Sequence, residues 1–390
     1  MHLVFVTSLV PDGAPSTGYE IANAAIIAAL RRQGVRVTVI GYVRPGRTPI
    51  DPDNTIVLGE IDPANENASP FRKIGWVAAA VINGLTVSSA KLRTMSDSAF
   101  ETALKSAGEC DAYVLNAVQM TAAYESAFAG KPTLFVAHNV EHISAVQNAW
   151  ATDSRLQSLL FSREAGLLRA IESRLCANAR FVFTLAEADR QALGVTGSGR
   201  SAVLPLVTAD KPVTVSPDRQ IAHDAGLIGT WTWQPNRVGL EWFLSEVTPY
   251  LPDDFRIAVA GSAPRDLAKR HQHVRFVGRV EDAGEFVRSS AVIPLISRAG
   301  TGVQLKTIET FEMGLPAVAT SSSLRGISMI PDNCEQADDP RTFASALQKL
   351  ARNPVLADGR MFHAAQLRGL DEAVSNGLKA LGHVEELVPA

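Results

Sequence analysis

Short apolar runs alternate along most of the chain with longer segments in which apolar residues recur every three or four positions. Such runs are typical of buried strands, and the longer segments are typical of helices that cover a sheet. The chain opens with a run at residues 2–10, a loop with two glycines at 11–18, a helical pattern at 19–32 and a second run at 35–40. This order is the usual beginning of a doubly wound parallel α/β sheet.

The pattern is interrupted once and then starts again. Residues 194–217 are dense in Gly, Ser, Thr and Pro, which is typical of a connection between domains. A new strand pattern at 225–228 runs into a glycine turn, and a helical pattern follows from about residue 235. We therefore expect two α/β domains with a boundary near residue 210.

A glycine loop, a helix and a strand are predicted in succession over residues 297–320. Gly300 and Gly302 allow backbone conformations that a side chain would forbid, and the helix is expected from Val303 to Met313. A helix that begins at such a loop points unpaired N–H groups and its positive dipole end at a bound phosphate. Lys306 and Glu309 share a face of this helix. They would either meet the diphosphate and the hydroxyls of a nucleotide-sugar, or form a solvated pair.

This stretch resembles the donor-binding segment of GT-B glycosyltransferases of the family 4 type, in the branch whose loop reads Gly-x-Gly-x-x-x-Lys-x-x-Glu before a helix that ends Gly-x-Pro. The resemblance implies that Lys306 contacts the donor diphosphate and that Glu309 holds the nucleotide ribose. Many members carry a further glutamate eight residues before the ribose-binding one, and this chain has Thr301 there. Together with Gly300 and Gly302, these residues are the predicted donor-binding loop and helix.

The resemblance also implies the overall organisation. The fold class is α/β, specifically GT-B, with two Rossmann-like doubly wound domains that face one another across a cleft. Residues 1–210 would bind the acceptor, residues 211–360 would bind the nucleotide-sugar, and the C-terminal helices at 361–390 would cross back to the first domain.

Further donor-binding residues follow from the same resemblance. The loop with Gly13 and Gly18 would face the cleft near the transferred sugar, unless it is a plain connection between strand and helix. Gly229 and Thr230 follow the first strand of the second domain, where the glycine would let the chain approach the donor phosphates. Arg279, after a later strand, would either add charge toward the diphosphate or be an exposed turn residue.

The candidates nearest the chemistry follow the strand expected at residues 132–137. A histidine at such a strand end can donate to a developing negative charge or shuttle a proton, and a carboxylate can act as a base. In the resembling family, a His-Asn pair followed by a glutamate faces the cleft at this position, so His138 and Glu141 are the predicted catalytic residues. Two alternatives remain open: a metal bound with His142, or a histidine that only caps the strand end.

Composition limits the possible classes. The chain has 390 residues, 46% of them hydrophobic, and a net charge of −3 at pH 7, which gives no electrostatic footprint for nucleic acid. Its three cysteines are widely spaced, so they indicate neither a disulfide framework nor a metal site. We expect no metal and no cofactor, with a nucleotide-diphospho-sugar as donor substrate, because Lys306 and the helix N-terminus at Gly302 would stabilise the leaving diphosphate.

One helical segment suggests where the acceptor is met. Residues 71–82 are apolar with a basic entrance, which fits either a packed helix or a helix resting on an anionic membrane, with Arg72, Lys73, Lys91 and Arg93 near the headgroups. The opening run at residues 2–10 lacks a basic start and is expected to be a strand rather than a signal peptide.

The sequence thus predicts a metal-independent hexosyltransferase of cell-surface polysaccharide or glycan biosynthesis. It would be cytoplasmic, peripheral at the inner face of the plasma membrane, with a saccharide acceptor linked to a polyprenyl diphosphate. Two alternatives are a GT-B sugar-nucleotide epimerase and a non-catalytic GT-B partner protein. The second is motivated by Thr301, which stands where the family carries its first glutamate.

Overall fold

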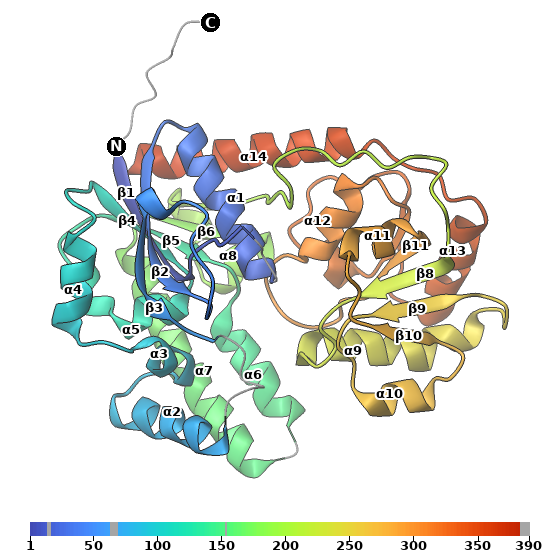
Figure 1. Ribbon diagram of the computed structural model, residues 1–390, viewed down its shortest axis with the longest axis horizontal. Coiled ribbons are helices and arrows are strands. Elements are labelled where there is room, and N and C mark those ends of the chain that lie inside the picture. The colour runs from blue at the N-terminus through green and yellow to red at the C-terminus, as the bar shows by residue number, and fades with distance from the viewer. Residues whose placement is uncertain (14–16, 63–68, 153, 383–390) are drawn as a thin grey trace, which may run out of the picture. The chain divides into compact units, whose positions relative to one another are not determined.

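The structure, a computed structural model, describes residues 1–13, 17–62, 69–152 and 154–382 of the chain. They form two units: Met1–Leu206 together with the residues from Arg368 on, and Val207–Leu367. Each unit is a parallel sheet with flanking helices (Figure 1), one of seven strands and the other of six. The predicted α/β architecture of two doubly wound sheets is confirmed.

The sheet of the first unit has the order β3-β2-β1-β4-β5-β6-β7. β1 is the central strand, and its Phe5 is in register with Val39 of β2 and Val114 of β4. All three side chains are buried, as expected for a parallel sheet covered by helices. The strands are β1 (His2–Leu9), β2 (Arg36–Val43), β3 (Thr55–Glu60), β4 (Ala112–Asn116), β5 (Thr133–Ala137), β6 (Phe181–Thr184) and β7 (Ser201–Val203).

The helices of the first unit begin mostly at polar caps. Thr17 and Glu20 form a capping box at the start of α1, in which each side chain accepts a hydrogen bond from the other residue's backbone N–H. Such a cap stabilises a helix by about 1 kcal/mol. The helices are α1 (Gly18–Arg32), α2 (Pro70–Ile82), α3 (Val87–Leu92), α4 (Asp97–Lys105), α5 (Val118–Ala123), α6 (Glu141–Ala151), α7 (Arg155–Asn178) and α8 (Glu187–Ala192).

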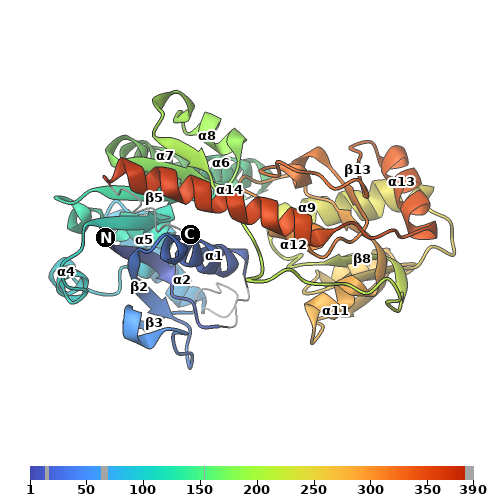
Figure 2. The same ribbon diagram turned by 90° about the horizontal axis from the view of Figure 1, so that it is seen from above.

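The last helix, α14 (Gly359–Ala380), begins in the second unit and continues into the first. Within the first unit it lies beside α1 (Figure 2), where Arg32 forms a two-pronged ion pair with Asp371, the shorter contact being 2.6 Å. Gly377 faces the ring of Phe183, and a β-carbon there would overlap this ring. The glycine therefore allows α14 to approach the sheet closely.

The second unit repeats the layout with the strand order β10-β9-β8-β11-β12-β13. Its strands are β8 (His223–Ile228), β9 (Ile257–Ala260), β10 (Arg275–Gly278), β11 (Ser290–Leu295), β12 (Ala317–Ala319) and β13 (Cys334–Gln336). Its helices are α9 (Gln234–Trp242), which continues as a π-helical turn at Phe243–Val247, α10 (Arg265–Arg270), α11 (Ala283–Arg288), α12 (Leu305–Glu312) and α13 (Pro340–Arg352). The core between sheet and helices contains Trp242, Phe243 and Phe343, whose rings meet edge to face.

One predicted boundary is wrong by two residues. The helix expected from Val303 begins at Leu305, because Gly302 has a positive φ of 74° and Gln304 is still extended. Its predicted end is right: Gly314 follows the helix with a φ of 66°, and a β-carbon there would overlap the carbonyl of Ala357.

Candidate functional site

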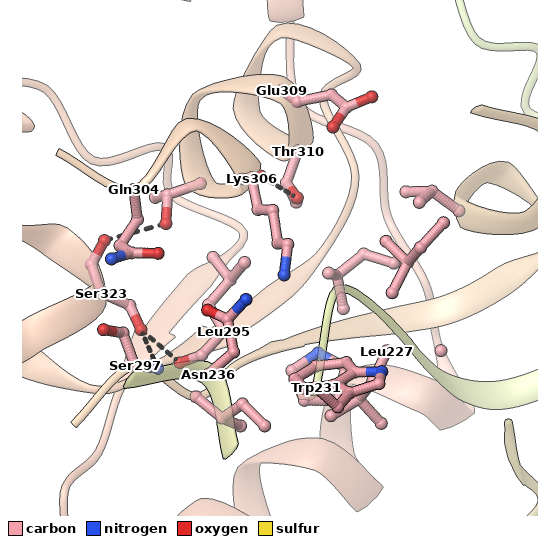
Figure 3. A pocket seen from close by; sticks show the side chains of 17 residues that line it. Leu227, Trp231, Asn236, Leu295, Ser297, Gln304, Lys306, Glu309, Thr310 and Ser323 are labelled. Carbon is pink, nitrogen blue, oxygen red and sulfur yellow. Dashed lines mark hydrogen bonds between the residues drawn. The ribbon is translucent and has the colours of Figure 1, made fainter. Parts of the chain in front are cut away.

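The candidate site is a cavity in the second unit, at the carboxyl ends of β8 and β11 (Figure 3). Its wall comes from these two strands, the loop after β11, the start of α9 and one face of α12. It contains about 580 Å³ of empty space, part of it open to solvent. Ligands of open parallel α/β sheets bind at this edge, so the cavity lies where the topology predicts a ligand.

Glycines keep the backbone compact along this edge of the sheet. Gly229, Gly261 and Gly278 stand at the ends of β8, β9 and β10, and the N–H of Gly261 donates to the carbonyl of Gly278 at 2.7 Å. A β-carbon at Gly261 would overlap the carbonyl of Gly229. One at Gly229 would lie 2.5 Å from the ammonium nitrogen of Lys306. Gly229 therefore makes the space that the lysine side chain occupies.

Backbone contacts hold the loop between β11 and α12. Gly300 has a φ of 90°, and the guanidinium of Arg325 donates to the carbonyls of Ala299 and Gly302, both at 3.4 Å. The hydroxyl of Ser323 accepts from the N–H of Ser297 at 2.8 Å. The loop is thus fixed by residues that come after β12.

The helix that follows this loop offers its N-terminus. Its N-cap residue, Gln304, makes no side-chain capping hydrogen bond. Gln304 also lines the cavity, so the first turn of α12 begins at the cavity wall. Uncapped N–H groups and the positive end of the helix dipole favour a bound anion there.

Lys306 points into the cavity toward Trp231 (Figure 3). Its ammonium nitrogen is 4.8 Å from the centroid of the indole ring, within the range of a cation–π contact. Trp231 is buried, and its indole N–H donates to the carbonyl of Ala260 at 2.8 Å, which fixes the ring. Burial lowers the pKa of Lys306 to about 8, although the charge of Glu309 acts in the opposite direction. An anion in the cavity would favour the charged form and raise this pKa.

Glu309 lies one turn later on α12 and lines the same cavity. Figure 3 shows its carboxylate directed away from the ammonium of Lys306. Burial raises the pKa of Glu309, whereas the charges of Lys306 and Arg288 lower it. Within the described part of the chain neither Lys306 nor Glu309 forms an ion pair, and both residues line the cavity. This arrangement can meet a diphosphate with one group and sugar hydroxyls with the other.

The other predicted donor-binding residues do not line the cavity. Gly229, Gly300, Thr301 and Gly302 belong to the two loops that border it, and Thr301 is half-buried. Thr230 is exposed, and its carbonyl accepts a hydrogen bond from the side chain of Asn236 at 3.1 Å.

Arg279 is also exposed, just beyond the end of β10. The sequence allowed two interpretations of Arg279, and its exposed position agrees with the second, an exposed turn residue. Sequence reasoning missed Asn236, Gln304 and Ser297, which line the cavity. It also did not predict Trp231, which is buried and lines the cavity as well.

His138 lies in the first unit, at the end of β5, in a buried polar cluster. Its Nε2 is 2.8 Å from the side-chain oxygen of Asn116, so Nε2 donates this bond and carries a proton. The amide nitrogen of Asn116 donates in turn to Asn23 at 2.7 Å and to Tyr19 at 3.1 Å. Tyr19 also packs its ring against the imidazole, with centroids 4.9 Å apart. Burial lowers the pKa of His138 to about 4, so the imidazole is neutral at physiological pH and suits hydrogen bonding rather than charge stabilisation.

Glu141 is the first residue of α6, whose N-terminus is capped by another carboxylate. Glu172 of α7 accepts hydrogen bonds from the backbone N–H groups of Glu141 and His142, at 2.7 and 3.3 Å, and contacts the imidazole of His142 at 2.6 Å. Burial raises the pKa of Glu141, and the neighbouring Glu172 raises it further, while hydrogen bonds from Gln119 and Asn139 lower it. A carboxyl group with a raised pKa is suited to proton transfer near neutral pH. The role of Glu172 was not predicted.

The remaining predicted residues flank a gap in the described ranges. Gly13 has a positive φ of 79°, and Gly18 is the first residue of α1. Residues 14–16, between them, lie outside the described part of the chain, so the predicted role of this loop stays a prediction.

The described residues contain neither a metal-binding cluster nor a membrane-spanning helix. No group of three or more His, Cys, Asp or Glu side chains is placed to hold a metal ion in these ranges. Nor does any helix in them combine the length and the apolarity needed to cross a bilayer.

Comparisons with known proteins concern the fold and the family of the chain. Residues 222–353, which include the whole cavity, match the family model described as glycosyl transferases group 1. No curated protein matches the chain.

Solved structures match over nearly the whole chain. The sucrose-phosphate synthase of Thermosynechococcus elongatus aligns with a TM-score of 0.65 and 16% identity over 97% of this chain and 96% of its own. HepE of Anabaena in complex with UDP-glucose gives a TM-score of 0.59 and 13% identity over 98% of both chains. The lipopolysaccharide outer core galactosyltransferase WaaB gives 0.57 and 11% over 97% and 99%. The cavity-bearing region therefore matches the glycosyl transferases group 1 family, and the chain has the GT-B fold of such glycosyltransferases, as its sequence predicted.

Proposed function

We propose that this glycosyltransferase moves a hexosyl residue from a nucleotide-diphospho-sugar to a hydroxyl of a saccharide acceptor. One observation carries the proposal: Lys306 and Glu309 face a single cavity at the N-terminus of α12 without pairing with each other. A half-buried cation and a half-buried carboxylate that line one cavity without pairing with each other are suited to external partners. A nucleotide diphosphate supplies an anion for the first and ribose hydroxyls for the second.

The residues present can support the reaction without a metal or a cofactor. Lys306 and the N–H groups at the start of α12 would stabilise the charge that develops on the leaving diphosphate. In the first unit, neutral His138 would hydrogen-bond to sugar hydroxyls. Glu141, whose pKa burial raises, would be the carboxylate that takes a proton if the transfer inverts configuration.

The donor and acceptor classes are part of the proposal. HepE was solved in complex with UDP-glucose, and WaaB is named as a lipopolysaccharide outer core galactosyltransferase, so one protein of this fold binds a hexosyl nucleotide and another is named for galactosyl transfer. We place this chain in cell-surface polysaccharide or glycan biosynthesis, with a polyprenyl-diphosphate-linked acceptor. It would act in the cytoplasm, peripherally at the inner face of the plasma membrane.

The test is a thermal-shift panel of nucleotide-sugars on the wild type and on Glu309→Ala. Ligand at about 100 times its dissociation constant should add about 2.7 kcal/mol to the free energy of unfolding. Glu309→Ala should lose this gain, and Glu246→Ala, which removes an exposed glutamate of the same unit, should keep it. Equal gains in both variants would contradict the proposal.

A second candidate, a non-catalytic GT-B partner, is favoured by Thr301 in place of the family's first glutamate. Release of nucleotide when a lipid-linked acceptor extract is added to the bound donor would exclude it. Conversion of the nucleotide-sugar without any acceptor would instead indicate an epimerase.

A further inference from the structure

The first unit exposes a concentration of large apolar side chains to solvent. Seven of the nine strongly exposed ones described in this unit lie on α2 and on the adjoining ends of α6 and α7, which Figure 1 shows at the lower edge of the unit. Trp150 is 83% exposed and Phe71 87%. We call these residues the tip surface: Phe71, Ile74, Val81, Ile82, Trp150, Leu156 and Leu159.

The two parts of the tip surface belong to one packed body. The guanidinium of Arg163, on α7, donates to the carbonyls of Ala80 at 2.9 Å and Leu85 at 3.1 Å, at the end of α2 and just beyond it. The carboxylate of Glu164 accepts from the N–H of Val87 at 2.8 Å, at the start of α3. These buried or half-buried bonds fix α2 against α7, so the apolar side chains are held outward by the fold.

Basic side chains accompany the apolar ones. α2 contains Arg72 and Lys73 and no acidic residue, and α7 opens with Arg155. None of these three cations forms an ion pair within the described ranges. The guanidinium of Arg72 lies 5.4 Å from the ring of Trp76 and the ammonium of Lys91 lies 4.7 Å from it, so two cations share one indole.

The acidic side chains near the tip surface are fewer. Burial lowers the pKa of Lys91, and the charge of Arg72 lowers it further, while Asp62 acts in the opposite direction. Glu66, shortly before α2, and Asp153, between α6 and α7, lie outside the described residues. Among the described residues the surface is therefore basic as well as apolar.

We propose that the tip surface docks on the headgroup region of an anionic lipid bilayer. Mixed apolar and basic side chains with tryptophans fit this region, because the apolar groups enter the acyl boundary while the cations remain among anionic headgroups. A protein partner fits less well, because the core of a protein–protein interface is depleted of charged residues. In the first turns of α2, Phe71 is followed by Arg72 and Ile74 is preceded by Lys73. The inference deepens the proposed function, since an enzyme docked in this way meets a lipid-linked acceptor at its own surface.

The test is sedimentation with vesicles of phosphatidylcholine, alone or with about one third phosphatidylglycerol. The wild type should bind the anionic vesicles, and binding should weaken with added salt because the charges are screened. Lys73→Glu should lower the partition coefficient by at least about fivefold, the value of one basic residue at such a surface. Trp150→Ser should lower it severalfold through the apolar contribution.

Matched controls come from the second unit. Lys269→Glu reverses an exposed lysine and Met361→Ser removes an exposed apolar side chain, and neither should change vesicle binding. A wild type that ignores anionic vesicles overturns the proposal, as does one that dimerises through Trp150 instead. Thermal stabilisation by UDP-glucose, measured on the same samples, reports on the cavity independently, so failure of docking is distinguishable from failure of the proposed function.

Discussion

The lowered pKa of Lys306 makes donor binding depend on pH in a predictable direction. Burial brings this pKa to about 8, so the ammonium loses its proton as the pH rises through 8 in the empty protein. A bound diphosphate favours the charged form and returns the pKa toward its ordinary value near 10.5. The affinity for a nucleotide-sugar should therefore be constant below pH 7 and should fall above pH 8.

The size of the fall follows from the two pKa values. Each pH unit between them is worth about 1.4 kcal/mol, so the dissociation constant should rise by about tenfold between pH 7 and pH 9. UDP-glucose is a suitable probe up to pH 9, because its diphosphate does not change charge there and its uracil ring is still mostly neutral. Isothermal titration calorimetry at several pH values gives the dissociation constant directly, and the enthalpy in two buffers gives the protons taken up on binding.

Substitutions at the same position separate Lys306 from other titrating groups. Lys306→Gln should bind weakly at every pH, and Lys306→Arg, whose guanidinium stays charged, should show a flat profile. Trp231→Phe weakens the π face under the ammonium and should shift the midpoint of the wild-type profile to lower pH by less than about one unit. A flat wild-type profile, or the same slope in Lys306→Gln, would refute the reasoning.

Three further predictions concern the frame of the two units. Gly229→Ala would place a methyl group against the ammonium of Lys306 and should weaken UDP-glucose binding by calorimetry, whereas Gly197→Ala, which meets nothing within 4 Å, should not. Gly261→Ala combines a φ of 99° with overlap on the carbonyl of Gly229, and should lower the free energy of unfolding in urea by about 3 kcal/mol or more. Glu172→Ala removes the cap of α6 and should cost about 1–2 kcal/mol in the same assay, with Glu172→Gln less affected; equal stability of the wild type and Glu172→Ala would contradict this role.

The strands were the most predictable part of the fold. Those of the two sheet centres are short, continuous apolar runs, because a parallel strand is buried on both faces. The start of α12 was less predictable, since an apolar residue such as Val303 fits the helical period while Gly302 still holds the chain in a turn. The period of the apolar residues shows which face of a helix is buried. The residue at which the helix begins depends on backbone angles, which this period does not encode.

The spacing of residues in the sequence predicted part of the candidate site but not all of it. The three-residue interval between Lys306 and Glu309 is enough to place both on one face of a helix. The contact of Lys306 with Trp231 depends on how the turn after β8 meets α12, and the cap that Glu172 provides depends on how α7 packs on α6. Neither contact can be predicted from the sequence of one segment alone. The only indication was that Glu172, an acidic residue, lies on the buried face of α7 and therefore needs a partner.

The separation of Lys306 from Glu309 is what most strongly connects the structure to a ligand. A protein that needed these residues only for stability would let them pair or would expose them fully, because withdrawing an unpaired charge even partly from water is costly. Here the lysine is held over an indole ring in space that Gly229 leaves open, and the carboxylate is turned away from it. Both pKa values are displaced by burial toward the neutral forms. A ligand that carries an anion and hydroxyl groups at matching positions would return both pKa values toward their ordinary range. The free energy of binding would then include the relief of the desolvation cost of the two charges.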